Sequence, residues 1–221
     1  KLPVETIRAI LQGGESVCEV AGIPLAGGHS INSTEPIYGL VAIGIVHPDR
    51  LKKNSDARAG DVLVLGKGMG VGVLSQALKK GALSADGYAQ LIASTTQLNT
   101  VGSALSGLKG VHALTDVTGF GLLGHLLEMC RGSGLAAELR FYHVPVLSEA
   151  LPLVQQGYGS GAIDRNLASY GHEVDFAAHL KNWQRRLLAD AQTSGGLLAA
   201  VAPDTLDEVL SCFYRAGFPE A

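Results

Sequence analysis

The stretch LTDVTGFGLLGHL, residues 114–126, joins a short apolar run to an apolar helical pattern through a glycine-containing turn. Its only acid, Asp116, directly follows the apolar run. A carboxylate at the end of a strand can bind Mg²⁺, and the backbone N–H groups at the start of a helix can bind phosphate. The same spacing also fits an N-cap or an Asx-turn for the following helix. The stretch therefore predicts a strand, a turn and a helix, and it leaves both interpretations of Asp116 open.

Strand and helix patterns alternate on both sides of this stretch. Apolar, β-rich runs predict strands at residues 38–46 (a buried one), 61–65, 111–114, 135–141 and 197–201. Helical periodicity predicts helices at residues 4–18, interrupted near Gly13 and Gly14, and at 73–80, 85–105, 120–131, 147–156, 180–189 and 204–216, the last with Asp204 as its N-cap. Residues 157–175 are predicted as a loop. The composition turns polar near residue 54, so we place a domain boundary there and expect a layered α/β domain after it.

The composition excludes several classes of protein. The 221 residues are 47% hydrophobic and carry a net charge of −3, so we expect neither a disordered chain nor a nucleic-acid partner. No apolar run is long enough for a membrane span, and the N-terminus lacks a signal-peptide pattern. Cys18, Cys130 and Cys212 form no CxxC pair and are interpreted as core residues. A reducing, cytoplasmic location is the default expectation.

Three other segments are candidates for ligand contact. Gly27 and Gly28 would let the backbone approach a ligand, and His29 and Ser30 offer donors to phosphate oxygens, although a strand-ending turn would look the same. The segment 66–72 matches neither G-x-x-x-x-G-K-[ST] nor G-x-G-x-x-G, so we interpret it as a structural turn. The polar segment 190–196 is either a ligand contact or a plain connection between a helix and a strand.

Five strings together resemble the selenophosphate synthetases, also called selenide, water dikinases, in sequence, order and spacing. They are residues 27–31, 52–55, 115–121, 166–171 and 190–196. The resemblance covers nearly the whole chain, and Asp-Val-Thr-Gly-Phe-Gly together with Gln-Thr-Ser-Gly-Gly is a specific combination. The wider superfamily is that of aminoimidazole-ribonucleotide synthetase, whose members bind ATP without a P-loop.

The resemblance implies an α+β fold of two domains. Residues 1–54 would be the remaining part of an N-terminal domain for ATP binding and dimerisation, and residues 55–221 a C-terminal α/β domain. The implied reaction converts ATP, selenide and water into selenophosphate, AMP and orthophosphate. In this reading Asp116 binds Mg²⁺, and Gly28, His29 and Ser30 contact ATP in a homodimer that involves no nucleic acid and no membrane.

The resemblance also implies that parts of the enzyme lie outside this sequence. The family's selenium-handling Cys or selenocysteine, its neighbouring Lys and other metal-binding Asp residues would precede Lys1, and further strands would follow Ala221. We therefore expect a fragment that is almost inactive alone, assign no catalytic residue within it, and expect association or partial disorder near residues 1–50. Two alternatives stay open: another ATP-using enzyme of the superfamily, such as a thiamine-monophosphate kinase or an amidoxime-type ATP ligase, and a non-catalytic relative that binds nucleotide or a partner.

Overall fold

The computed structural model describes residues 2–221 and divides the chain into two compact units, residues 1–48 and 49–221. Each unit is described by itself. The assignment of residues 1–54 and 55–221 to two functional domains stays a prediction.

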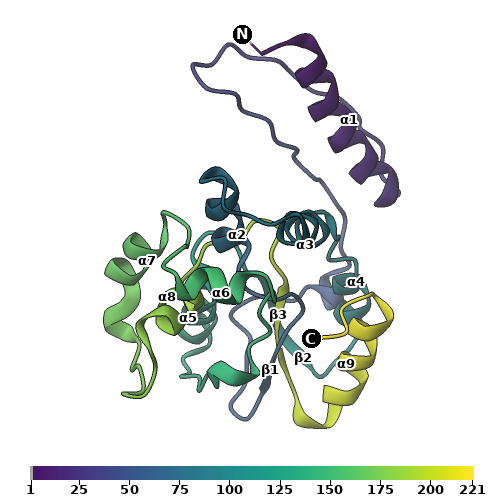
Figure 1. Cartoon of the computed structure of the whole chain (residues 1–221). Coiled ribbons are helices and arrows are strands. Elements are labelled where there is room, and N and C mark those ends of the chain that lie inside the picture. The colour runs from purple at the N-terminus through teal and green to yellow at the C-terminus, as the bar shows by residue number, and fades with distance from the viewer. Residues whose placement is uncertain (1) are drawn as a thin grey trace. The chain divides into compact units, whose positions relative to one another are not determined.

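The first unit is one long helix followed by an extended segment (Figure 1). Helix α1 spans Val4–Val20 without a break, so the predicted interruption at Gly13 and Gly14 is wrong. Gly14 is buried, and a Cβ there would lie 1.8 Å from the Tyr38 hydroxyl oxygen, so this glycine serves close packing and does not end the helix. The helix thus keeps a residue that costs about 1 kcal/mol in propensity because a larger one would displace Tyr38.

The buried strand predicted at residues 38–46 is absent. These residues have no regular secondary structure, and Ile43 is 94% exposed. A strand exists only through hydrogen bonds to a neighbouring strand, and the described part of this unit contains none for it. The apolar composition favours a strand, but composition alone does not supply a partner strand.

The second unit contains, within residues 49–221, one three-stranded sheet in the order β1-β3-β2. Strands β1 (Val62–Leu65), β2 (Val111–Asp116) and β3 (Leu197–Val201) were all predicted within a few residues. The central strand β3 runs antiparallel to both neighbours. Its sequence LLAAV is apolar at every position because helices cover both faces of the sheet (Figure 1).

Alternate residues of β3 enter two separate cores. Leu198 and Ala200 pack in the larger core with side chains from α2, α5, α6, α7 and α8, whereas Ala199 and Val201 pack with α4 and α9. The helices of this unit are α2 (Val71–Lys79), α3 (Ala85–Thr96), α4 (Val101–Ser106), α5 (Gly121–Ser133), α6 (Ala150–Gln155), α7 (Ile163–Tyr170), α8 (Asn182–Leu188) and α9 (Leu206–Arg215). The result is a three-layer arrangement with the sheet in the middle.

Several predicted elements of this unit differ from the structure. The helix predicted at residues 85–105 is divided into α3 and α4, because Gln97 turns to an extended conformation at the end of α3. Residues 135–140 are not a strand, since no described strand pairs with them. The predicted loop 157–175 contains α7, and α6 begins later than predicted.

The predicted N-cap of the last helix is also wrong. Helix α9 begins at Leu206, after a short 3₁₀ turn spanning Pro203–Thr205, and the residue before it is Thr205. Pro203 fixes a backbone dihedral that suits the 3₁₀ turn, which places Asp204 inside that turn and not at the cap.

Candidate functional site

The predicted metal ligand Asp116 is the last residue of β2, and it is exposed. It lies opposite Leu197, the first residue of β3. The next residue, Val117, is fully buried, and its N–H donates to the Gly196 carbonyl oxygen at 2.9 Å. The carboxylate is therefore presented at the end of a strand whose backbone is held on both sides of it. Asp116 does not cap α5, because no side chain caps that helix.

Helix α7 supports the turn that follows Asp116. The Asn166 amide nitrogen donates to the carbonyl oxygens of Gly119 and Ala189, both at 3.0 Å. The Tyr170 hydroxyl donates to the Phe120 carbonyl oxygen at 2.6 Å. Burial raises the pKa of Tyr170 to about 12, so the hydroxyl keeps its proton for this bond. The string 166–171, which contributes to the family resemblance, thus acts by bracing the turn.

The polar segment 190–196 supports the same turn from another direction. The Gln192 N–H donates to the Thr118 carbonyl oxygen at 2.9 Å. The Gln192 side-chain oxygen accepts from the N–H groups of Gly70 and Val71, both at 3.1 Å. These bonds satisfy N–H groups at the start of α2 that the helix itself cannot use. The Gln192 side chain therefore binds protein backbone, whereas Thr193 and Ser194 of the same segment are exposed.

Asp190 completes this support and is fully buried. Its carboxylate accepts from the N–H groups of Val73 at 3.1 Å and Ser160 at 2.9 Å. Desolvation raises the pKa of Asp190, while these hydrogen bonds lower it. A carboxylate at a helix N-terminus is also favoured by the helix dipole. Segment 66–72 accordingly leads into α2 as a structural turn, as predicted.

Lys67 lies at the centre of the bonds that hold segment 190–196. It is buried, and its ammonium donates to the carbonyl oxygens of Ser94 at 2.9 Å, Gln97 at 2.7 Å and Ser194 at 2.6 Å. Burial lowers its pKa to about 8. Sequence reasoning missed this role, because the three acceptors are backbone groups that no residue pattern reveals. The bonds at the end of α3 also account for the break between α3 and α4.

Residues Gly28, His29 and Ser30 lie in the first unit. All three are exposed and belong to a segment without regular secondary structure. Their predicted contact with ATP and their relation to Asp116 stay predictions.

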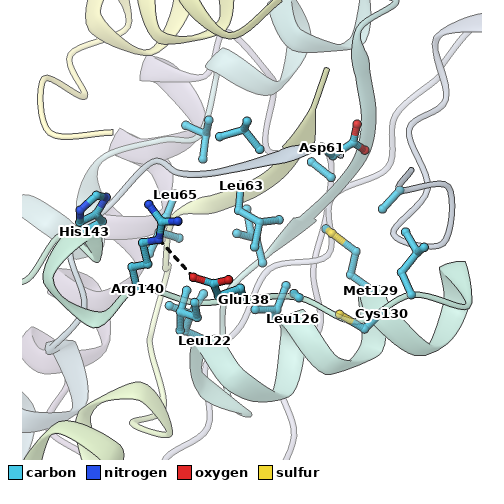
Figure 2. Close-up of a pocket in the computed structure, with 18 of the residues that line it drawn as sticks. Asp61, Leu63, Leu65, Leu122, Leu126, Met129, Cys130, Glu138, Arg140 and His143 are labelled. Carbon is cyan, nitrogen blue, oxygen red and sulfur yellow. Dashed lines mark hydrogen bonds and ion pairs between the residues drawn. The ribbon is translucent and has the colours of Figure 1, made fainter. Parts of the chain in front are cut away.

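A pocket of about 720 Å³ lies between β1 and α5 of the second unit (Figure 2). Leu63 and Leu65 line one wall, and Leu122 and Leu126 line another. Charged side chains at its rim include Arg140, which donates to Glu138 at 3.2 Å. None of the predicted site residues line it, and its apolar walls give no cluster of polar groups for chemistry.

Residues 2–221 offer few other groups for metal binding or nucleophilic chemistry. No group of three or more His, Cys, Asp or Glu side chains there could hold a metal ion. Cys18 and Cys212 are buried, and burial raises the pKa of the half-buried Cys130, which disfavours the reactive thiolate. No helix in this described part is both long and apolar enough to cross a membrane.

Comparison with known proteins assigns the chain to a protein family. A family model described as AIR synthase related protein, C-terminal domain, matches residues 58–221, and the corresponding N-terminal domain model matches residues 1–46. The chain belongs to the AIR synthase related family. This membership agrees with the predicted α+β fold of two domains.

Individual relatives show which members of the family the chain is most similar to among those compared below. The chain is 61% identical over 220 residues to the selenide, water dikinase of Burkholderia pseudomallei, covering 100% of this chain and 62% of the relative. It is 58% identical over 218 residues to that of Dechloromonas aromatica, covering 99% and 63%. The chain thus spans less than two thirds of the length of these curated relatives. A crystal structure of Escherichia coli HypE, a hydrogenase maturation protein, has a TM-score of 0.70 at 18% identity and covers 99% of this chain and 60% of HypE, which supports the fold.

Proposed function

We propose that this chain is the larger part of a selenide, water dikinase, an enzyme that uses ATP, selenide and water to form selenophosphate, AMP and orthophosphate. The observation that carries the proposal is the 61% identity over 220 residues to a relative of that name. The HypE structure supports the fold alone.

In the proposed enzyme, Asp116 binds Mg²⁺ and residues Gly28, His29 and Ser30 contact ATP across a homodimer. The exposed Asp116 carboxylate fits a Mg²⁺ site, because Mg²⁺ is usually held by one or two carboxylates together with phosphate oxygens and water. When bound, the ion would neutralise charge on the phosphates. The Asp116 carboxylate would be held in a fixed position, because α7 and segment 190–196 both form hydrogen bonds to the turn beside it.

We expect the 221-residue chain alone to form little or no selenophosphate. Within residues 2–221 Asp116 belongs to no group of three or more His, Cys, Asp or Glu side chains that could hold a metal ion, and none of the three thiols is fully exposed. In this proposal the missing groups come from the longer protein of which the chain is a part.

The experiment is a graft into a full-length relative. Residues 1–221 replace the matching segment of the Burkholderia pseudomallei dikinase, and AMP and orthophosphate are assayed together with and without selenide. The proposal predicts AMP that depends on selenide in the chimera and none in the isolated chain. Phosphorylation of thiamine monophosphate would favour another ATP-using enzyme of the superfamily, and nucleotide binding without turnover would favour a non-catalytic relative.

A further inference from the structure

The apolar pocket beside β1 is bounded by two extended segments as well as by helices. Residues 62–65 of β1 and residues 135–140 both line it. Helix α5 contributes Leu122 and Leu126, and α9 contributes Leu206 (Figure 2). Because β1 is an edge strand of the sheet, the pocket is an apolar slot along that edge.

The outer side of β1 carries unpaired backbone groups. The Gly66 N–H donates to the Leu197 carbonyl oxygen at 2.9 Å, which sets the alternation of hydrogen bonds between β1 and β3. In an antiparallel pair only alternate residues exchange bonds, so Val64 bonds to β3 and the N–H and C=O groups of Leu63 and Leu65 point away from it. Within residues 2–221 these outward groups have no hydrogen-bond partner.

The segment on the other side of the slot has the same deficit. Among the residues that the structure describes, no backbone group of residues 136–139 has a hydrogen-bond partner. Ala136 and Ala137 are exposed, and Leu139 is half-buried against the larger core. This is the segment whose composition predicts a strand and which lacks a partner strand. Both sides of the slot therefore present backbone groups that can form the hydrogen bonds of a sheet.

These two rows of backbone groups define what fits between them. An occupant that pairs with both rows must carry donors and acceptors at the spacing of a strand, about 3.3 Å per residue. A small apolar ligand would cover the walls but leave the backbone groups unpaired, which is costly once water is excluded. Helices of both cores line the slot, so the fitting strand is apolar on both faces, like the sequence LLAAV of β3.

The position of Ala221 indicates where such a strand comes from. Ala221 itself lines the pocket, so a residue joined to its carbonyl end would start at the slot. The chain covers 62% of the Burkholderia pseudomallei relative, so more than a third of that relative lies outside the match.

We propose that a short apolar strand, following Ala221 in the longer protein, inserts between β1 and residues 136–139 and pairs with both. The proposal rests on the proposed function only in taking the chain as part of a longer protein. The insertion would extend the sheet beyond β1 and convert residues 136–139 into its new edge strand. It also explains why an apolar pocket without polar groups for chemistry lies beside this sheet.

The test is amide hydrogen exchange, followed by NMR with leucine and valine labelled, in three proteins. They are the 221-residue chain, a chimera that adds only the relative's segment before Lys1, and the full-length chimera that also adds the segment after Ala221. We expect the amides of Leu63 and Leu65 to exchange about 100-fold more slowly in the full-length chimera than in the other two proteins. The Val64 amide, which faces β3, is the internal control and should be protected in all three.

A matched pair of substitutions tests whether the slot is filled. Leu63→Lys places an ammonium in the slot, and it should lower the melting temperature of the full-length chimera more than that of the 221-residue chain, because only a filled slot excludes water. Leu78→Lys, on α2 and outside the pocket, should cause the same small shift in both proteins, since Leu78 is 44% exposed.

Four results would overturn the proposal. They are equal exchange of Leu63 and Leu65 in all three proteins, protection by the segment before Lys1 alone, protection in the 221-residue chain that grows with its concentration, and equal shifts from Leu63→Lys in both proteins. The third result would mean that a second copy occupies the slot. A full-length chimera that forms no AMP but shows the expected protection would reject the dikinase and keep the inserted strand.

Discussion

Replacing Lys67 by methionine tests whether the buried ammonium holds the loop beside Asp116. Methionine keeps the length and the apolar character of the side chain but has no donor. The carbonyl oxygens of Ser94, Gln97 and Ser194 would lose the ammonium that they now contact at 2.6–2.9 Å. These three acceptors lie at the end of α3 and in segment 190–196, so the variant loosens both at once.

The free energy of unfolding that Lys67→Met should lose follows from these contacts. Three hydrogen bonds to a charged donor are worth about 5 kcal/mol together. Burial lowers the pKa of Lys67 to about 8, because the folded protein desolvates the charged ammonium. Removing this charge stabilises the folded state by about 2 kcal/mol, a value reduced because water still reaches part of the side chain. The net destabilisation is therefore about 3 kcal/mol. For a unit of this size the melting temperature should fall by about 6–12 °C.

The assay is thermal and urea unfolding of the wild type, Lys67→Met and Lys109→Met. Lys109 is exposed, and within residues 2–221 its side chain makes no hydrogen bond or ion pair, so its variant should stay within about 0.5 kcal/mol of the wild type. Amide exchange at Val117 and Gln192, whose N–H groups bond across the loop, should rise in Lys67→Met only. Equal stability of the two lysine variants would refute the reasoning.

Two further predictions concern the same network. Gly72→Ala should destabilise by about 2–4 kcal/mol, since its Cβ would lie 2.4 Å from an Asp190 carboxylate oxygen, whereas Gly161→Ala, with open space around it, should be neutral in urea unfolding. Tyr170→Phe should cost about 1 kcal/mol at pH 7 through loss of the bond to Phe120. Because the folded-state pKa of Tyr170 is raised from 10 to about 12, wild-type stability should fall as pH rises through this window, and Tyr170→Phe should lack that part of the decline in pH-dependent unfolding.

Sequence patterns predict the sheet of the second unit well, because each strand is short, apolar and bounded by glycine or polar residues. The same reasoning fails at residues 38–46, where the pattern suits a strand but the described unit offers no partner. It also misses α7, although Ile163, Leu167 and Tyr170 have helical spacing, because polar residues and glycines around them resemble a loop. Patterns within one segment therefore predict local structure, and partners distant in sequence decide whether it forms.

At the turn beside Asp116, too, local structure follows from the local sequence, whereas its supporting contacts come from residues distant in sequence. The strand, the turn and the start of α5 could be predicted from residues 114–126 alone. Its supports could not: Lys67 reaches carbonyl oxygens 27, 30 and 127 residues away, and Asn166 reaches Gly119 across 47 residues. The family resemblance singled out strings 166–171 and 190–196 without a physical reason, and the structure supplies one, because both brace this turn.

We propose that this turn presents Asp116 for phosphate transfer in a selenide, water dikinase. The most direct measurement is phosphorus NMR of the full-length chimera supplied with Mg²⁺, ATP and selenide, compared with its Asp116→Asn and Asp164→Asn variants. Asp164 is an exposed acid on α7 and serves as the matched control. We expect selenophosphate and AMP from the chimera and from Asp164→Asn, and neither product from Asp116→Asn. Full selenophosphate formation by Asp116→Asn, or none by the unaltered chimera, would contradict it.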